Sequence, residues 1–155
     1  MNASPTTQII LLADDDLDDT SLFCEALASA NSDVICYYTG NGQEVLNKLG
    51  ELEAKPHLIF LDINMPVMNG WQCLKRLKAH ETYKHIPTII YSTSSHQRDI
   101  GIALELGALC FFTKPSDFLQ LTKILSIIAN NLGPGLVEAI RKIDDSESRS
   151  LFTFQ

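Results

Sequence analysis

The sequence has little positive charge, no long apolar run and no recognisable export signal. Only 12 of its 155 residues are Lys or Arg, against 19 Asp or Glu, which gives a formal net charge of −7. General binding to nucleic acid needs a basic surface that displaces counterions, so this composition disfavours it. No apolar run approaches the roughly 20 residues that cross a bilayer, and the N-terminal segment MNASPTTQ has neither a basic region nor an apolar core. We therefore expect a cytoplasmic protein without a membrane or nucleic-acid partner.

Cysteine and histidine patterns typical of metal sites are also absent. The four cysteines never form a CxxC pair, and the four histidines show no ligand spacing. The residues concerned are Cys24, Cys36, Cys73, Cys110, His57, His80, His85 and His96. Without an export signal, we expect reduced, buried thiols rather than disulfides, and no zinc site.

Strand-like apolar runs alternate with helix-like periods along most of the chain. Hydrophobic residues make up 45% of the sequence, enough for one domain with a real core. The expected strands cover residues 8–13, 34–38, 57–61, 88–91 and 109–113, and the expected helices are centred on residues 23–30, 45–49, 71–77, 100–104 and 118–132. Five such βα units predict an α/β fold: a doubly wound, five-stranded parallel sheet with helices on both faces.

The pattern changes at Gly133-Pro134-Gly135, so we predict a domain over residues 7–132 and a C-terminal extension over 133–155. The extension is too short to be a second domain. Residues 136–143 can form a short helix, and the apolar end at residues 151–154 could pack onto the domain, a second copy or a partner, or be disordered.

Five aspartates crowd residues 14–19 and account for five of the seven net negative charges. Carboxylates are favourable at a helix start, which explains those that follow Asp15. Asp14 and Asp15, however, directly follow a buried strand, where neighbouring carboxylates repel one another. A bound divalent cation would remove this repulsion.

Other polar residues follow the later predicted strands. Asp62 follows the third strand, Ser92 ends the fourth and Lys114 follows the fifth. Because the carboxyl ends of parallel strands share one edge of the sheet, these residues are expected to meet Asp14 and Asp15 there. Three carboxylates form an oxygen-rich site that suits Mg²⁺, to which a main-chain carbonyl near Asn64 could add a ligand.

A carboxylate beside a divalent cation can attack a phosphoryl group and form an aspartyl phosphate. The reaction needs an in-line nucleophile, a cation across the phosphoryl oxygens and further donors for their charge. Lys114 can supply a point charge, and the Ser92 hydroxyl can donate a hydrogen bond. Asp62, Lys114 and Ser92 are thus the candidate reacting and charge-stabilising residues.

Four segments together resemble the receiver domain of two-component response regulators. They are LLADDD at 11–16, LIFLDINMPVMNG at 58–70, IIYSTS at 89–94 and GALCFFTKP at 107–115, and the resemblance covers about residues 7–132. It implies a CheY-like, flavodoxin-like fold with strand order 2-1-3-4-5. It also implies a phosphoprotein of a phosphorelay, with no further enzymatic function beyond its own phosphorylation and slow dephosphorylation.

The resemblance assigns roles to individual residues. It makes Asp62 the phosphoacceptor, and it makes Asp14, Asp15, Asp62 and the Asn64 main-chain carbonyl the ligands of Mg²⁺, with Mn²⁺ as a substitute. Lys114 would pair with the phosphoryl group. The Lys114–Pro115 peptide bond would be cis. Two further sets of residues would act in switching and in hydrolysis. Ser92 and Phe111 would be the switch pair, and Asn64 and Ser94 would tune hydrolysis.

The resemblance also implies partners. The phosphoryl donor would be a sensor histidine kinase or a histidine phosphotransfer protein. A stand-alone regulator would signal to a downstream protein target through the face made by the fourth helix, fifth strand and fifth helix. The same face, or the C-terminal tail, could mediate a homodimer.

Three other functions compete with this hypothesis. A phosphohydrolase with a DxD motif would need a carboxylate where this chain has Asn64. A flavin or nucleotide binder would need a phosphate loop after the first strand, where Asp14–Asp19 would repel phosphate. A receiver that only binds partners would not need Asp62 and Lys114.

Overall fold

The computed structural model describes residues 7–94, 96–147 and 151–153. Ser95, in the polar run after the fourth strand, lies outside the described residues, and so does Phe154 of the expected apolar end. Most of the N-terminal segment MNASPTTQ also lies outside them.

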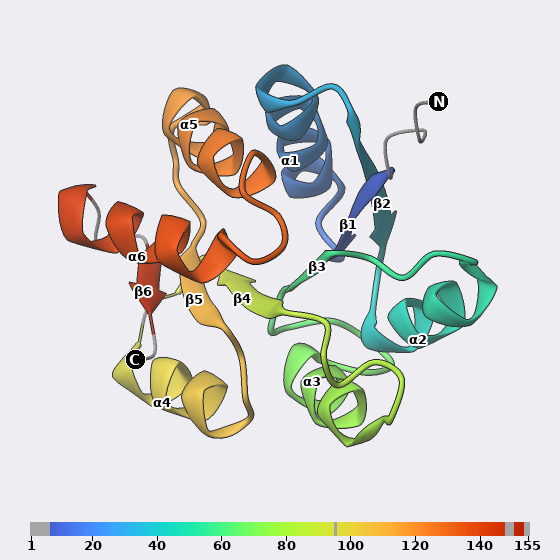
Figure 1. Cartoon of the computed structure of the whole chain (residues 1–155). Helices are drawn as coiled ribbons and strands as arrows, with labels where there is room; N and C mark the ends of the chain where they lie inside the picture. The colour runs from blue at the N-terminus through green and yellow to red at the C-terminus, as the bar shows by residue number, and fades with distance from the viewer. Residues whose placement is uncertain (1–6, 95, 148–150, 154–155) are drawn as a thin grey trace, which may run out of the picture.

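Five parallel strands form the sheet in the order β2-β1-β3-β4-β5, as expected (Figure 1). The strands are β1 (Gln8–Ala13), β2 (Val34–Thr39), β3 (Leu58–Leu61), β4 (Thr88–Ser92) and β5 (Cys110–Thr113). The helices that follow them are α1 (Leu17–Ala30), α2 (Gly42–Glu51), α3 (Gly70–Ala79), α4 (Gln97–Glu105) and α5 (Phe118–Ala129). The α/β fold and its strand order are therefore confirmed.

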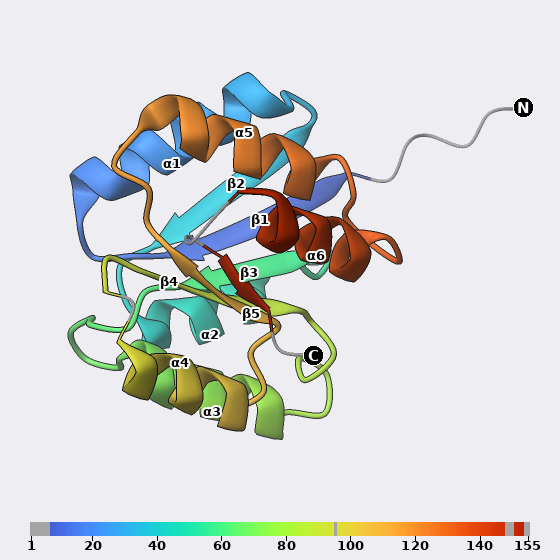
Figure 2. The same cartoon turned by 90° about the vertical axis from the view of Figure 1, so that its left-hand side faces the viewer.

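Alternate strand residues pack against opposite helix layers. Ile10 and Leu12 of β1 belong to the core beneath α1 and α5, whereas Leu11 and Ala13 belong to the core against α2, α3 and α4. Figure 2 shows the two layers, with α1 and α5 above the sheet and the other three helices below it. Burial on both faces explains why these strands read as continuous apolar runs.

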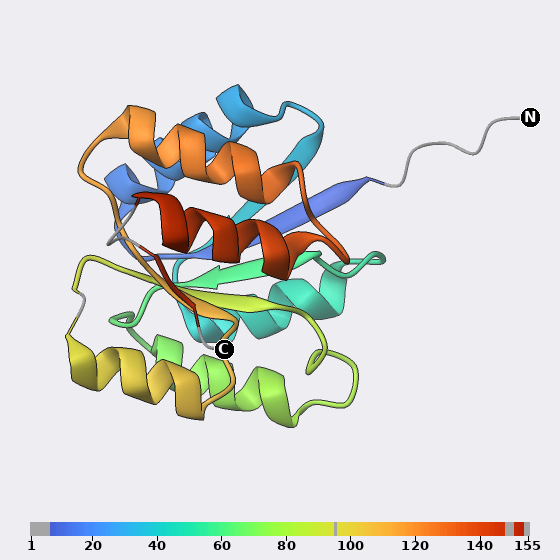
Figure 3. The same ribbon diagram turned by 60° about the vertical axis from the view of Figure 1, so that its left-hand side comes forward.

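The C-terminal extension packs onto the domain, which is one of the alternatives left open by the sequence. Its helix α6 (Leu136–Glu147) is longer than predicted, and the strand β6 (Leu151–Thr153) pairs antiparallel with β5 (Figure 3). The prediction of a five-stranded sheet is therefore incomplete, because a sixth strand covers the outer edge of β5. An unpaired strand edge leaves backbone groups without partners, and β6 supplies them.

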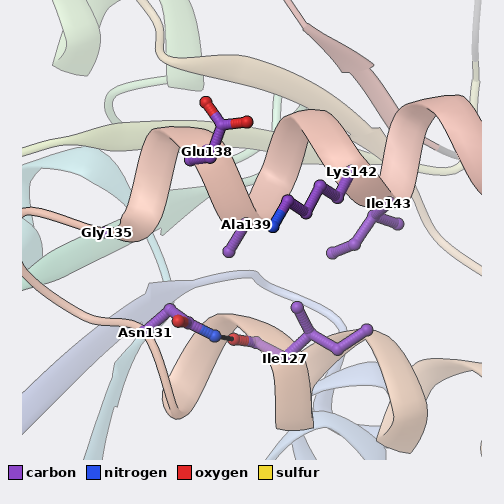
Figure 4. A pocket seen from close by; sticks show the side chains of 7 residues that line it. All are labelled: Ile127, Asn131, Gly135, Glu138, Ala139, Lys142 and Ile143. Atoms are coloured by element: carbon purple, nitrogen blue, oxygen red, sulfur yellow. Dashed lines mark hydrogen bonds between the residues drawn. The ribbon is translucent and has the colours of Figure 1, made fainter.

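A cavity of about 580 Å³ lies between α5 and α6 (Figure 4). It is lined by Ile127, Asn131, Gly135, Glu138, Ala139, Lys142 and Ile143. None of these residues is at the carboxyl edge of the parallel strands, so this cavity is separate from the site described next. Within the described part of the chain, no helix is long and apolar enough to cross a membrane.

Candidate functional site

Backbone hydrogen bonds continue the sheet past the ends of β1 and β3 and fix the two central aspartates. The Asp14 amide donates to the Thr39 carbonyl at 3.0 Å, and the Asp62 amide donates to the Ala13 carbonyl at 2.9 Å. The side chain of Asp14 is buried and that of Asp15 is exposed. The strand ends therefore bring one carboxylate under the surface and leave another open to water.

Lys114 lies at the centre of the site and contacts three carboxylates. Its ammonium group is 2.7 Å from Asp14 Oδ2, 2.9 Å from Asp19 Oδ2 and 3.5 Å from Asp62 Oδ2. These pairs connect residues that are 52 to 100 positions apart in the chain. Burial alone would lower the pKa of Lys114, but the hydrogen bonds to Asp14 and Asp19 raise it, so the side chain stays charged.

One expectation about Lys114 is wrong. The described residues contain no cis peptide bond, so the Lys114–Pro115 bond is trans. The trans form is the lower-energy isomer of an X–Pro bond by about 0.5–1 kcal/mol. The ammonium group reaches the carboxylates with this isomer.

Carboxylate oxygens of Asp14, Asp15 and Asp62 lie within 4.8 Å of one another. Carboxylate oxygens at this spacing can share one Mg²⁺-type cation, which prefers oxygen ligands and keeps several of its waters. The exposure of Asp15 leaves room for those waters. The expected acidic group at the sheet edge is thus present.

Asp19 also belongs to the site, although the sequence indicated only a role for it at the helix start. Asp16 caps α1 by accepting hydrogen bonds from the amides of Asp18 and Asp19. The cap holds the first turn of α1 next to the strand end, and from there Asp19 reaches Lys114. The sequence did contain a signal for this role, because Asp19 is the third residue of a capped helix and faces back over the preceding loop.

The carboxyl group of Asp62 is poised to exchange a proton near neutral pH. Burial, together with the neighbouring charge of Asp14, raises the pKa of Asp62 to about 6, although Lys114 and the Ile63 amide act in the opposite direction. The Ile63 amide donates to Asp62 Oδ1 at 2.8 Å. Crowding of the carboxylates thus favours the protonated form when no cation is bound.

This pKa predicts a pH-dependent stability in the presence of a metal chelator. The ordinary pKa is 3.8 and the folded-state value is about 6, so the folded protein binds the proton more tightly than the unfolded chain. The resulting stabilisation is complete below pH 3.8 and is lost as the pH rises through 6. Relative to wild type, Asp62→Asn is expected to gain about 2 kcal/mol of unfolding free energy between pH 4 and pH 7. Urea unfolding of both proteins at several pH values measures this, and a constant difference would contradict it.

The other predicted residues occupy varied positions. Ser92 is buried at the end of β4, where its Oγ accepts a hydrogen bond from the Ser94 amide at 3.2 Å. Phe111 is fully buried in the core against α3 and α4. Asn64 is exposed in the loop after β3. Ser92 is joined to Lys114 through the main chain, since the Lys114 amide donates to the Ser92 carbonyl at 2.7 Å.

The loop between β3 and α3 folds back tightly on Asp62. The Gly70 amide donates to the Ile63 carbonyl at 2.8 Å, and a Cβ atom at position 70 would overlap the carbonyl oxygen of Asp62. Val67 has a φ of 66°, a left-handed conformation that costs a β-branched residue about 1–2 kcal/mol. Glycine at position 70 is thus a requirement of the backbone around the candidate phosphoacceptor.

Comparison with known families agrees with this geometry. The sequence model described as "Response regulator receiver domain" matches residues 10–126. The match spans β1 to α5 and includes every predicted site residue.

Similar proteins include both short and long chains. Response regulator Rcp1 of Synechocystis is 30% identical over 123 residues, which are 76% of this chain and 84% of Rcp1. The protein-glutamate methylesterase/protein-glutamine glutaminase of Bacillus licheniformis is 37% identical over 72% of this chain, but the match spans only 30% of that protein. The chain thus spans about a third of the methylesterases it matches.

Solved structures of the shorter proteins share the fold. The phosphorylated cyanobacterial phytochrome response regulator RcpA superposes with a TM-score of 0.74 at 30% identity, covering 82% of this chain and 94% of RcpA. The Mn²⁺-bound form of Rcp1 superposes with a TM-score of 0.69 at 27% identity, covering 79% of this chain and 92% of Rcp1.

Proposed function

The chain belongs to the response regulator receiver domain family, and from this premise we propose that Asp62 accepts a phosphoryl group in a divalent-metal-dependent reaction. The observation that carries the proposal is the convergence of Asp14, Asp15 and Asp62 at one edge of the sheet, where Lys114 contacts Asp14 and Asp62. RcpA, which has been solved in a phosphorylated form, and Mn²⁺-bound Rcp1 support it by similarity.

The proposed donor is a phosphohistidine on a sensor histidine kinase or a histidine phosphotransfer protein. An oxygen of Asp62 forms a bond to phosphorus while the phosphorus–nitrogen bond breaks, and the bonding electrons leave with the imidazole. Only the ionised carboxylate is a nucleophile, so a cation that lowers the pKa of Asp62 from about 6 also activates it.

Each surrounding residue has a role in this proposal. Asp14, Asp15 and Asp62, with the Asn64 main-chain carbonyl, hold the cation, for which Mn²⁺ is an acceptable substitute for Mg²⁺. When bound, the cation neutralises the charge of the phosphoryl oxygens. Lys114 needs only to shift from Asp14 and Asp19 to pair with a phosphoryl oxygen, and its ion pairs already keep it charged.

The phosphoryl group adds about −1.5 to −2 charges to the site. The Ser92 hydroxyl is proposed to donate to a phosphoryl oxygen, and a change in the packing of Phe111 is proposed to carry the signal toward α4 and β5. Asn64 and Ser94 flank the site and are proposed to tune hydrolysis by controlling access of water. A downstream protein would then read the changed surface.

The C-terminal extension alters the proposed signalling face. We propose that residues 7–132 form the receiver unit and that residues 133–155 modify its output. Because β6 pairs with the outer edge of β5, a protein target or a second copy that approaches this edge meets β6 and α6 rather than β5. A homodimer through the edge of β5 would require β6 to move.

Acetyl phosphate provides a direct test of the phosphorylation. With Mg²⁺ present, intact-mass spectrometry is expected to show one added phosphoryl group. The adduct should be absent in excess chelator and should return when Mg²⁺ or Mn²⁺ is restored. A chain that gains no phosphoryl group under any of these metal conditions would contradict the proposed function.

Loss of one metal ligand is expected to weaken Mg²⁺ binding. Asp15→Asn removes an exposed carboxylate of the acidic group without opening the core, and we expect its Kd for Mg²⁺ to rise by at least about tenfold. The fluorescence of Trp71, in the first turn of α3 after the Asp62 loop, reports the titration. Asp18→Asn is the matched control, because it removes the same charge from the same helix start without belonging to the acidic group. Equal affinities of the two variants would contradict the ligand assignment.

A further inference from the structure

A second reactive cluster lies outside the acidic site, where the two thiols of Cys24 and Cys36 meet. Their Sγ atoms are 3.4 Å apart, although the residues are 12 positions apart in the sequence and lie in α1 and β2. Both side chains are half-buried, whereas Cys73 and Cys110 are fully buried. The expectation of buried thiols is therefore wrong for Cys24 and Cys36, because they sit at a sheet edge rather than in the core.

The position of the pair gives it access to solvent. β2 is an edge strand of the sheet, with β1 as its neighbour. Cys36 lies opposite Ile10 in the pairing of β2 with β1 and packs at the margin of the core beneath α1. Cys24 contacts it from α1, and neither residue is fully buried.

The contact also makes the two sulfur atoms chemically different. The contact with Cys36 lowers the pKa of the Cys24 thiol from 9.0 to about 7, and the same contact raises the pKa of Cys36. Near pH 7 a large fraction of Cys24 is therefore thiolate, which is the reactive form of cysteine. Cys36 remains a thiol beside it. This is the arrangement of an attacking and a resolving cysteine.

We propose that Cys24 and Cys36 form a peroxide-sensitive thiol pair, which closes to a reversible intramolecular disulfide between α1 and β2. The Sγ atoms, already in contact at 3.4 Å, approach to about 2 Å when the bond forms.

The chemistry balances with hydrogen peroxide as the oxidant. The Cys24 thiolate attacks one peroxide oxygen, the oxygen–oxygen bond breaks, and the products are a Cys24 sulfenic acid and hydroxide. The Cys36 sulfur then attacks the Cys24 sulfur, and the sulfenic oxygen leaves with the Cys36 proton, so that one water is released. Two thiols are oxidised by two electrons and one peroxide is reduced.

Mild oxidation of the full-length chain tests the proposal. After treatment with a small excess of hydrogen peroxide, intact-mass spectrometry should show the loss of two hydrogen atoms, and peptide mapping should find one bond between Cys24 and Cys36. Dithiothreitol should restore the original mass. In Cys24→Ser the bond should not form, and in every sample Cys73 and Cys110 should remain reduced, because both are buried.

A second measurement tests the role of the contact itself. The rate of Cys24 alkylation by iodoacetamide should reach half its maximum near pH 7 in the wild type. Cys36→Ala removes the sulfur partner of Cys24, so this midpoint should rise by at least about one pH unit and the rate at pH 7 should fall by about tenfold.

Three outcomes would overturn the proposal: a disulfide between two copies of the chain, oxidation of Cys24 to sulfinic acid without a bond to Cys36, or equal alkylation profiles for wild type and Cys36→Ala. The proposal does not depend on phosphorylation of Asp62. Phosphorylation by acetyl phosphate measured on the oxidised and reduced forms separates failure of the thiol pair from failure of the proposed function.

Discussion

Asp62→Asn is expected to reduce the phosphoryl adduct formed with acetyl phosphate and Mg²⁺ by at least about 100-fold. The amide oxygen that replaces the carboxylate is a poor nucleophile, whereas the main-chain contact with Ile63 can be kept. Neighbouring carboxylates should not take over the reaction, because Asp14 is buried and engaged by Lys114 at 2.7 Å. Intact-mass spectrometry over a time course measures the loss.

The same substitution removes one negative charge from a crowded site, so the variant is expected to be more stable than the wild type at pH 7 when no metal is bound. On this argument, loss of the adduct is not expected to come from unfolding. Asp18→Asn is the control and should be phosphorylated like the wild type, since its exposed side chain lies outside the acidic group. An undiminished adduct on Asp62→Asn would show that another residue accepts the phosphoryl group.

Gly70→Ala is expected to destabilise the domain by about 3 kcal/mol or more, which corresponds to a decrease in Tm of roughly 10 °C. The added Cβ overlaps the carbonyl oxygen of Asp62 and lies 3.0 Å from the Cα of Ile63. These are backbone atoms, so no side-chain rotation can relieve the overlap. Because the displaced segment contains Asp62, the proposed phosphoacceptor, the rate of phosphorylation should fall as well.

Gly50→Ala is a matched control with the opposite sign. Gly50 lies in α2, and no atom is within 4 Å of the position that its Cβ would occupy. Alanine there should stabilise the domain by about 0.5–1 kcal/mol, because glycine is the poorer helix former. Thermal unfolding of the two variants compares the same substitution with and without a backbone overlap. A similar Tm for both would contradict the close approach of Gly70 to Asp62.

The sheet and most of the site could be predicted because both follow from local patterns. The apolar runs are buried on both faces, so they mark the strands without any tertiary information. The carboxyl ends of parallel strands lie along one edge, and this places Asp62 beside Asp14 even though they are 48 positions apart in the sequence.

Other features depend on distances that no local pattern encodes. Asp19 contacts Lys114 because the cap of α1 sets the direction of the first helical turn. The end of α5 at Ala129, short of the predicted Leu132, reflects a cap at Asn130 and the left-handed Gly133. The apolar side chain of Leu151 could be buried against several surfaces. The pairing of β6 with β5 in the folded chain determines which surface it contacts.

The order of strands and helices along the chain and the acidic edge of the sheet could be predicted from the sequence alone, because residue type, periodicity and strand polarity suffice for them. Tertiary packing decided which charges Lys114 contacts, where β6 pairs and that Cys24 meets Cys36. These contacts join segments that are far apart in the chain or have several apolar surfaces to choose from, so they depend on how the elements are oriented in space and not on which elements form.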